Sequence, residues 1–450
     1  MIHKYRLNGY NIVLDPNSGA VHLLDGLAFS LLDYIEDVPD SICPPRILSA
    51  LSDKYSSDDI AEAYGELHSL YKSGQLWSSD DYGEIDGVFT EQSPIKAICL
   101  HVAHDCNLRC QYCFASKGDF GRGRELMDSE TGMRAIDFLV ANSGKRHNLE
   151  VDFFGGEPLM NWDVVKEIVA YARSIEKEHD KNFRFTLTTN GLLLSEDKIP
   201  YINQEMDNVV LSLDGRPEVN DAIRIRADGS GSYDSIIDKY KTFVRSRGTK
   251  DYYIRGTYTK YNLDFANDAK HMFGMGFDQI SIEPAVTNDK LPFAITDEDL
   301  PRIFDEYEKL ALHMIENRDS GNNFFHFMLD LGQGPCLIKR LRGCGSGNEY
   351  IAIVPGGDIY PCHQFVGMQE WRMGNIHTGE FDESIKTLFA RTSVRSKQEC
   401  KNCWAKYYCS GGCNANNFIF TGDVGNPHPL SCQLEKKRLE CAIMIKAALK

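Results

Sequence analysis

Strand-like and helix-like segments alternate six times between residues 95 and 320, and this alternation limits the possible folds more than any other feature. The strand-like segments are rich in β-branched and aromatic residues, as in AICLHVAH at 97–104 and FRFTLTTN at 183–190. Helical patterns separate them, for example over 162–178 and 232–246. Such strands are expected to run parallel and to be covered by the helices. The other expected strands span 149–156, 208–215, 252–260 and 279–285.

Small and polar residues follow the ends of these strands. In parallel sheets and barrels, functional groups lie at the carboxyl ends of the strands. We therefore expect one site to form where the strands end. The residues at these ends are Cys106, Gly155-Gly156-Glu157, Thr189-Asn190, Ser212, Asp214-Gly215, Arg255 and Glu283.

Cys106, Cys110 and Cys113 form a C-x3-C-x2-C pattern directly after the first strand. Three thiolates hold three irons of a 4Fe–4S cluster and leave the fourth iron open to another ligand. A structural zinc ion is the alternative, but it takes four ligands. His101 and His104 come too early in the chain to complete such a site. The spacing therefore favours an iron–sulfur cluster.

This pattern resembles the signature of the radical S-adenosylmethionine (SAM) superfamily, and the likeness covers residues 92–320. It implies an α/β fold with a partial (β/α)6 barrel of the TIM type. The family often has His-Asp where this chain has Asn220-Asp221, which is a departure from the pattern. The resemblance assigns SAM contacts to Tyr112, Gly155, Gly156, Glu157, Thr189, Asn190, Ser212, Asp214 and Arg224.

The resemblance also implies a mechanism. An electron from the reduced cluster cleaves SAM to methionine and a 5′-deoxyadenosyl radical, which removes a hydrogen atom from an unactivated C–H bond. The cluster ligands Cys106, Cys110 and Cys113 would then be the catalytic residues. The protein would position the target carbon and exclude water.

Seven further cysteines lie at ligand spacing in the last quarter of the chain. Short segments dense in Gly, Cys, Tyr and Trp are typical of a domain that depends on metal ligands for its stability. The spacing resembles the SPASM domain with two auxiliary 4Fe–4S clusters, here over residues 336–440, which brings the expected total to three clusters. A pair of zinc ribbons is the alternative. The resemblance assigns Cys400, Cys403, Cys409 and Cys432 to an outer cluster and Cys344, Cys362 and Cys413 to an inner cluster.

Cys336 leaves one question open for the inner cluster. It lies eight residues before Cys344, so it either completes the inner cluster or leaves the fourth iron open. An open iron could bind and deprotonate a substrate thiol.

Residues 1–85 predict a separate module. Three short strands within residues 3–25 precede helices near 26–36, 44–55 and 57–75, the last with an N-cap signal at its start. The module resembles the winged-helix-like domain by which peptide maturases recognise a leader segment. An exposed strand edge can accept a peptide by strand addition.

Charge and hydropathy narrow the possible partners. A net charge of −16 argues against nucleic-acid binding, because an acidic surface repels phosphate groups. The sequence has no apolar stretch of membrane-spanning length and no signal-like start, so we expect a cytoplasmic protein. Fourteen cysteines in such a protein favour metal or redox chemistry over disulfides.

Taken together, the three parts look most like the maturases of sactipeptide and ranthipeptide thioethers, of the type that acts on SCIFF peptides. The resemblance implies a thioether between a Cys sulfur and a carbon of another residue in a ribosomally made, Cys-rich precursor peptide. That peptide would be bound through its leader, with ferredoxin or flavodoxin as electron donor. Three alternatives stay open: an anaerobic sulfatase-maturing enzyme that makes formylglycine, a relative that makes C–C or epimerised products, and a zinc-stapled peptide-binding protein.

Overall fold

A computed structural model of the chain describes residues 1–80, 93–285, 287, 290–329, 331 and 337–449. The six expected strands are present, and each begins and ends within three residues of its expected bounds. Neighbouring strands pair in parallel in chain order, which confirms an α/β fold with a central parallel sheet. The strands are β4 (Ala97–His104), β6 (Asn148–Gly155), β7 (Asn182–Thr189), β8 (Met206–Ser212), β9 (Asp251–Tyr258) and β10 (Gln279–Pro284).

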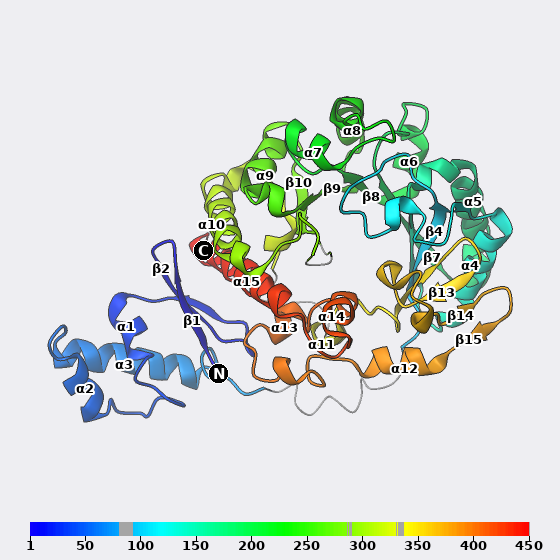
Figure 1. Cartoon of the computed structure of the whole chain (residues 1–450). Helices are drawn as coiled ribbons and strands as arrows, with labels where there is room; N and C mark the ends of the chain where they lie inside the picture. The colour runs from blue at the N-terminus through cyan, green and yellow to red at the C-terminus, as the bar shows by residue number, and fades with distance from the viewer. Residues whose placement is uncertain (81–92, 286, 288–289, 330, 332–336, 450) are drawn as a thin grey trace.

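The sheet curves into an open arc with helices on its outer side (Figure 1). In β6 the alternate residues Leu149, Val151 and Phe153 are fully buried in the core that the sheet shares with these helices. Glu150 and Asp152 point to the opposite, concave face, so β6 alternates in polarity, whereas every residue of β4 is buried. The covering helices are α4 (Ser129–Asn142), α5 (Trp162–His179), α6 (Ile199–Glu205), α7 (Pro217–Ile223), α8 (Tyr233–Ser246), α9 (Phe265–Gly274) and α10 (Leu300–Glu316).

The sheet extends past both ends of the six-strand array. At one edge β11 (Asn323–Phe324) pairs in parallel with β10, and at the other β12 (Tyr350–Ile353) pairs in parallel with β4. The sequence predicts only short segments dense in Gly and Cys around β12, yet the sheet continues across the domain boundary expected at residue 336. The remaining strands are β5 (Glu125–Leu126), β13 (Asp358–Tyr360), β14 (Gly374–Asn375) and β15 (Glu380–Phe381).

The cysteine-rich region lies across the open side of the arc (Figure 1). Its short helices are α11 (Leu337–Arg342), α12 (Glu383–Arg391), α13 (Lys406–Cys409) and α14 (Asn414–Thr421). The sequence analysis missed its longest helix, α15 (Pro429–Ala448), which packs on α10 and on the N-terminal strands. Because both sides of α15 are covered, the consecutive residues 441–444 are all fully buried, and no one-sided apolar stripe marks the helix in the sequence.

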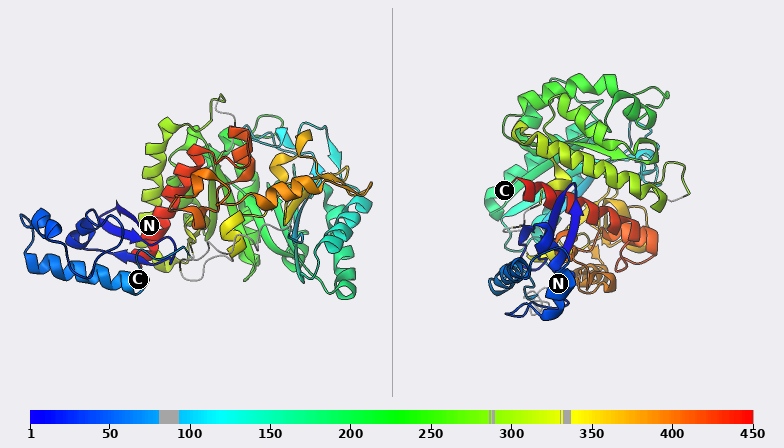
Figure 2. Two further views of the ribbon diagram at one scale, coloured as in Figure 1. Left: turned by 90° about the horizontal axis from the view of Figure 1, so that it is seen from below. Right: turned by 90° about the vertical axis from the view of Figure 1, so that its left-hand side faces the viewer.

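The N-terminal module projects to one side of the molecule, beside α15 (Figure 2). It contains the antiparallel strands β1 (His3–Leu7), β2 (Tyr10–Leu14) and β3 (Val21–Leu23), followed by α1 (Gly26–Leu31), α2 (Pro45–Leu51) and α3 (Ser57–Lys72). Ser56 caps α3, as its sequence predicts. Helix α1 ends five residues earlier than expected. These elements alone do not establish a winged-helix fold, and the expected boundary at 85–92 lies outside the described residues.

Among the described residues, no helix is both long and apolar enough to cross a membrane.

Candidate functional site

The loop after β4 brings Cys106, Cys110 and Cys113 to one cavity, which we call the loop cavity. The Arg109 N–H anchors this loop by donating to the Ile225 carbonyl at 2.7 Å. Burial raises the pKa of Cys106 to about 12 and that of Cys110 to about 11. Buried thiolates need a positive charge beside them, so these three side chains fit the cationic core of an iron–sulfur cluster.

Gly155 and Gly156 let the end of β6 approach this loop closely. A Cβ at Gly156 would lie 2.1 Å from the Asp105 carbonyl oxygen, and one at Gly155 would lie 2.2 Å from the Ala103 carbonyl oxygen. The Gly156 N–H donates to the Ala103 carbonyl at 2.7 Å. Only glycine fits at these positions, and the resulting space fits a bound cofactor against exposed backbone.

Glu157 ties the ends of β6 and β7 together from a fully buried position. Its carboxylate accepts hydrogen bonds from Thr189 Oγ1 at 2.7 Å, from the Asn190 N–H at 2.8 Å and from the Leu159 N–H at 3.0 Å. Burial raises the pKa of Glu157 to about 7, against the lowering effect of these bonds. Asn190 in turn donates to Asn107 Oδ1 at 2.8 Å and to Cys106 Sγ at 3.6 Å. Glu157 therefore orients Asn190 beside the cysteine loop.

Tyr112, Asp214 and Arg224 form a buried chain on the other side of the loop cavity. The Tyr112 hydroxyl donates to Asp214 at 2.8 Å and accepts from Arg224 Nη1 at 2.5 Å. Asp214 also accepts from the Thr257 N–H, and it lies behind the cavity wall, whereas Tyr112, Arg224 and Ser212 line the cavity. The buried Arg224 Nε has no hydrogen-bond partner among the described residues. A free guanidinium donor here fits a ligand carboxylate such as that of SAM.

The outer cysteines come together although they lie on separate elements. Cys400, Cys403, Cys409 and Cys432 line one cavity of about 380 Å³. Burial raises the pKa of Cys400 to about 11 and that of Cys409 to about 12. Four thiols around one cavity fit a 4Fe–4S cluster.

The inner cysteines also lie close to one another. Burial raises the pKa of Cys362, and the neighbouring thiols Cys413 and Cys344 raise it further. Cys362 is buried, whereas Cys344 and Cys413 are exposed. Cys336 lies outside the described residues. The four outer cysteines thus share one cavity, while the division into an outer and an inner set and the roles as ligands stay a prediction.

A central cavity of about 350 Å³ adjoins both cysteine sets, with Cys413, Cys409 and Cys432 in its wall. Glu283, at the end of β10, also lines it and accepts from Arg255 Nη2 at 2.6 Å. Burial alone would raise the pKa of Glu283, but the guanidinium groups of Arg255 and Arg438 hold it below its ordinary value. Glu283 is therefore an ionised carboxylate facing the central cavity.

His326 and Arg438 belong to the same wall and were missed by the sequence analysis, because neither lies in a motif. Arg438 Nη1 lies 3.1 Å from His326 Nδ1, and a guanidinium can only donate, so His326 Nδ1 accepts. Burial and Arg438 lower the pKa of His326 to about 3. The neutral ring therefore carries its proton on Nε2, which lies 3.2 Å from Ser281 Oγ.

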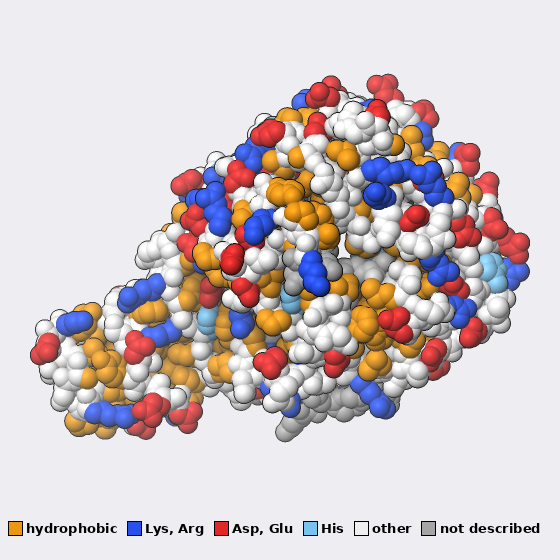
Figure 3. Space-filling view, in the orientation of Figure 1, with side chains coloured by type: hydrophobic (Ala, Val, Ile, Leu, Met, Phe, Trp, Pro, Cys, Tyr) orange, Lys and Arg blue, Asp and Glu red, His pale blue; other side chains and the backbone are white. Residues whose placement is uncertain are grey.

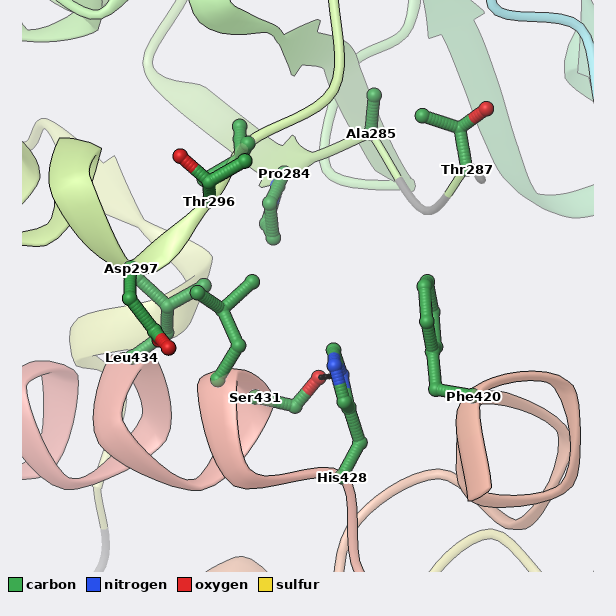
Figure 4. Close-up of a pocket in the computed structure, with 11 residues that line it drawn as sticks. Pro284, Ala285, Thr287, Thr296, Asp297, Phe420, His428, Ser431 and Leu434 are labelled. Atoms are coloured by element: carbon green, nitrogen blue, oxygen red, sulfur yellow. Dashed lines mark hydrogen bonds between the residues drawn. The ribbon is translucent and has the colours of Figure 1, made fainter. Parts of the chain in front are cut away.

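A rim cavity of about 290 Å³ continues the central cavity towards the surface. The two share Pro284, His428, Ser431 and Leu434 in their walls. Figure 4 shows Phe420 and His428 on one side of the rim cavity, facing Pro284 and Ala285 on the other. The Phe420 and His428 rings stack at 4.0 Å. The space-filling view is hollowed between the barrel and the C-terminal region (Figure 3).

Comparisons with known proteins agree with this arrangement. Residues 100–254 match the sequence model of the radical SAM superfamily. Residues 344–404 match that of SPASM, an iron–sulfur cluster-binding domain. Both expected domains are thereby confirmed.

Two relatives align with most of the chain. A cysteine-type anaerobic sulfatase-maturating enzyme of Clostridium novyi is 26% identical over 336 residues, which is 69% of this chain and 86% of the relative. The radical SAM cyclopropyl synthase TigE of Paramaledivibacter caminithermalis is 22% identical over 420 residues, which is 88% of this chain and 84% of the relative.

Among solved structures, SuiB of Streptococcus suis has a similar fold. Its complex with S-adenosylmethionine has a TM-score of 0.57 at 16% identity, over 96% of this chain and 98% of SuiB. Its complex with the precursor peptide SuiA has a TM-score of 0.53 at 17% identity over the same shares. The chain is therefore an enzyme with a radical SAM domain and a SPASM domain, which bind SAM, a 4Fe–4S cluster and auxiliary iron–sulfur clusters.

Proposed function

We propose that the enzyme modifies a polypeptide, and that it joins a Cys sulfur to a carbon of another residue in a ribosomally made, Cys-rich peptide. The names of the relatives support a polypeptide substrate, since they include a sulfatase-maturating enzyme and SuiB with its precursor peptide. The resemblance of the sequence to SCIFF-type maturases supports a thioether product.

The inner cysteine set is the observation that carries the thioether proposal. The resemblance assigns Cys344, Cys362 and Cys413 to this set, while Cys336 lies outside the described residues. If these three are its only protein ligands, a 4Fe–4S cluster leaves one iron open. Cys413 lines the central cavity, so a substrate thiol arriving from that cavity would reach the inner cluster. Binding to iron would deprotonate the thiol and hold its sulfur beside the target carbon.

Residues of the loop cavity would hold the SAM-binding cluster and SAM. Cys106, Cys110 and Cys113 would ligate the cluster, while Arg224 would pair with the SAM carboxylate. The bound cofactors supply a 5′-deoxyadenosyl radical that takes a hydrogen atom from carbon, and auxiliary clusters that accept the electron released as the C–S bond forms.

The thiol proton then needs an acceptor. Glu283 is ionised and lines the same cavity as Cys413, so its carboxylate would take this proton. One C–H bond and one S–H bond are thus replaced by one C–S bond, with the hydrogen atom, the proton and the electron each accounted for.

The N-terminal module would bind the leader segment. In the sheet order β1-β2-β3, the outer edge of β3 has no strand partner among the described residues, and its Leu23 is exposed. An extended leader could pair with this edge by strand addition. A ferredoxin or flavodoxin would supply the electron.

Anaerobic reconstitution with SAM and a Cys-rich precursor peptide tests the proposal. We expect 5′-deoxyadenosine, a peptide lighter by two hydrogen atoms and one fewer alkylatable thiol. Glu283→Gln should slow peptide modification, whereas Glu298→Gln, at a nearby exposed site, should not. Deoxyadenosine without any change in the peptide would contradict the proposal.

Formylglycine formation is the second candidate, favoured by the ionised Glu283 as a base and by the sulfatase-maturating relative. The products distinguish the two reactions. Conversion of a Cys to formylglycine releases its sulfur and leaves an aldehyde that reacts with hydrazides. A thioether keeps the sulfur and forms no aldehyde.

A further inference from the structure

Lys397 is a buried cation between the two auxiliary cysteine sets. Lys397 is only 2% exposed. Its Nζ donates to the Gly411 carbonyl at 2.7 Å and to Asn414 Oδ1 at 3.0 Å. Gly411 lies between Cys409 of the outer set and Cys413 of the inner set, and Asn414 follows Cys413 directly. The ammonium therefore contacts the segment that joins the two sets.

Neither hydrogen-bond partner carries a charge. A buried ammonium costs several kcal/mol unless an anion lies nearby. Among the residues that the structure describes, no carboxylate forms an ion pair with Lys397. The Cys400 N–H donates to the Lys397 carbonyl at 3.0 Å, and the groups whose negative charge would favour the ammonium are Cys400, Cys409, Cys413 and Cys432. The anions that balance Lys397 are thus cluster ligands.

The backbone makes room for this lysine. Gly411 has a φ of +83°, and a Cβ there would lie 3.2 Å from both Cδ and Nζ of Lys397. A side chain at position 411 would therefore press the ammonium away from the carbonyl that it contacts. The Gly-Gly pair between Cys409 and Cys413 lets the cation reach the cysteines.

We propose that Lys397 is a positioning residue whose ammonium stabilises the reduced state of the auxiliary clusters and so raises their reduction potentials. The proposal rests on the two auxiliary ligand sets that the resemblance assigns and on the proposed function of the enzyme. One-electron reduction adds one negative charge to a cluster and leaves its ligands in place. A fixed positive charge in a poorly solvated region favours that change. Three of the four cysteines around Lys397 belong to the outer set, so the outer cluster should respond more strongly.

The test is a dithionite titration of the reconstituted holoenzyme, followed by electron paramagnetic resonance. In Lys397→Met we expect the ratio of reduced to oxidised outer cluster at a fixed potential to fall about tenfold, which is 59 mV for a one-electron couple. Lys397→Arg keeps the charge and should keep the wild-type ratio. Lys401→Met removes a charge beside Cys400, but Lys401 is exposed and screened by solvent, so its effect should be small. The SAM-binding cluster should not shift and is the internal reference.

The other outcomes of this experiment also test the proposal. Unchanged auxiliary ratios in Lys397→Met, or an equal shift of the SAM-binding cluster, would overturn the proposal. If Lys397→Met and Lys397→Arg both lose auxiliary iron, Lys397 has a packing role and the electrostatic role is wrong. Loss of auxiliary iron in Lys397→Met but not in Lys397→Arg would support a requirement of the auxiliary clusters for the positive charge. If the wild-type protein binds only enough iron for the SAM-binding cluster, the auxiliary ligand sets are wrong and this proposal is overturned.

Discussion

The carboxylate of Asp80 accepts hydrogen bonds from the Tyr407 hydroxyl at 2.6 Å and 2.7 Å, across 327 residues of sequence. Lys406 Nζ lies 3.0 Å from the same carboxylate. Tyr407 and Lys406 lie between Cys403 and Cys409 of the outer cysteine set. The contact therefore joins the end of the N-terminal module to the helix that carries part of the outer cysteine set.

We expect Asp80→Asn to lower the free energy of unfolding by about 1 kcal/mol at pH 7, since Asp80 is partly exposed and its bonds are screened by solvent. Burial alone would raise the pKa of Asp80, but Tyr407 and Lys406 hold it below its ordinary value. For an acid with a lowered pKa, this stabilisation is complete above the ordinary pKa of about 4 and is lost at lower pH.

Urea unfolding of the wild-type protein and Asp80→Asn between pH 3 and pH 7 measures this effect. The difference between them should shrink as the pH falls below about 4. Asp53→Asn, at an exposed position in the same module, is the control and should leave the free energy of unfolding unchanged. A difference that stays constant with pH would show that the Asp80 charge does not stabilise the contact.

Replacement of Cys106, Cys110 and Cys113 together by Ala should remove one cluster and leave the auxiliary clusters intact. Iron content should fall from about 12 to about 8 atoms per chain, since each cubane holds four irons. Deoxyadenosine formation should stop, while the auxiliary resonance signals persist. Cys99→Ala is the control, because Cys99 is buried in β4 outside the three sets, and it should keep all the iron. If the auxiliary resonance signals vanish in the triple variant, the SAM-binding cluster and the auxiliary clusters do not occupy separate sites.

The sequence was sufficient to predict the six strands, because runs of β-branched and aromatic residues between helical patterns are a local property. It also indicated the three cysteine sets, because ligand spacing within a loop or turn is a local property. Lys397, His326 and Arg438 could not be predicted. Their positions depend on how α15 and the auxiliary segments pack against the barrel, and no local pattern records a contact such as that of Arg438 with His326.

Contacts between distant segments also limit the prediction of the sheet order and of how the N-terminal module is attached. Strand β12 pairs with β4 although about 250 residues separate them, so its membership of the sheet depends on the closed fold. The contact of Asp80 with Tyr407 likewise joins segments whose sequences show no sign of each other. Gly155 and Gly156 could be predicted only in part. Their resemblance to a SAM-binding segment was visible, but the close approach to the Ala103 and Asp105 carbonyls was not.

Arg224→Lys should weaken SAM binding about tenfold and leave the fold intact. The lysine keeps a positive charge near the buried Asp214, but it lacks the planar fork that can contact Tyr112 and a ligand carboxylate together. Equilibrium dialysis of labelled SAM with the reconstituted enzyme measures the affinity. Arg226→Lys, two residues along the chain, should keep wild-type affinity because Arg226 does not line the loop cavity. Equal affinities for the wild-type enzyme and Arg224→Lys would rule out this role for Arg224.

Gly156→Ala should disrupt the SAM-binding cluster more than any single change outside the cysteines. The added Cβ would lie 2.1 Å from the Asp105 oxygen and 3.0 Å from the Gly118 oxygen, and both are backbone atoms that no side-chain rotation can move. The loop that starts at Cys106 must shift, at a cost of about 3 kcal/mol in the free energy of unfolding. We expect iron content to fall to about 8 atoms per chain, as in the triple cysteine variant.

Gly65→Ala is the matched control for this change. Gly65 lies in α3, and a Cβ there would meet nothing within 4 Å. Alanine in a helix is more stable than glycine by about 1 kcal/mol, so this variant should be slightly stabilised and should keep all its iron. Iron analysis and urea unfolding of both variants separate a general effect of glycine replacement from the backbone contact at Asp105. If Gly156→Ala keeps its iron and its SAM affinity, then the close approach of β6 to the cysteine loop is not needed to build the site.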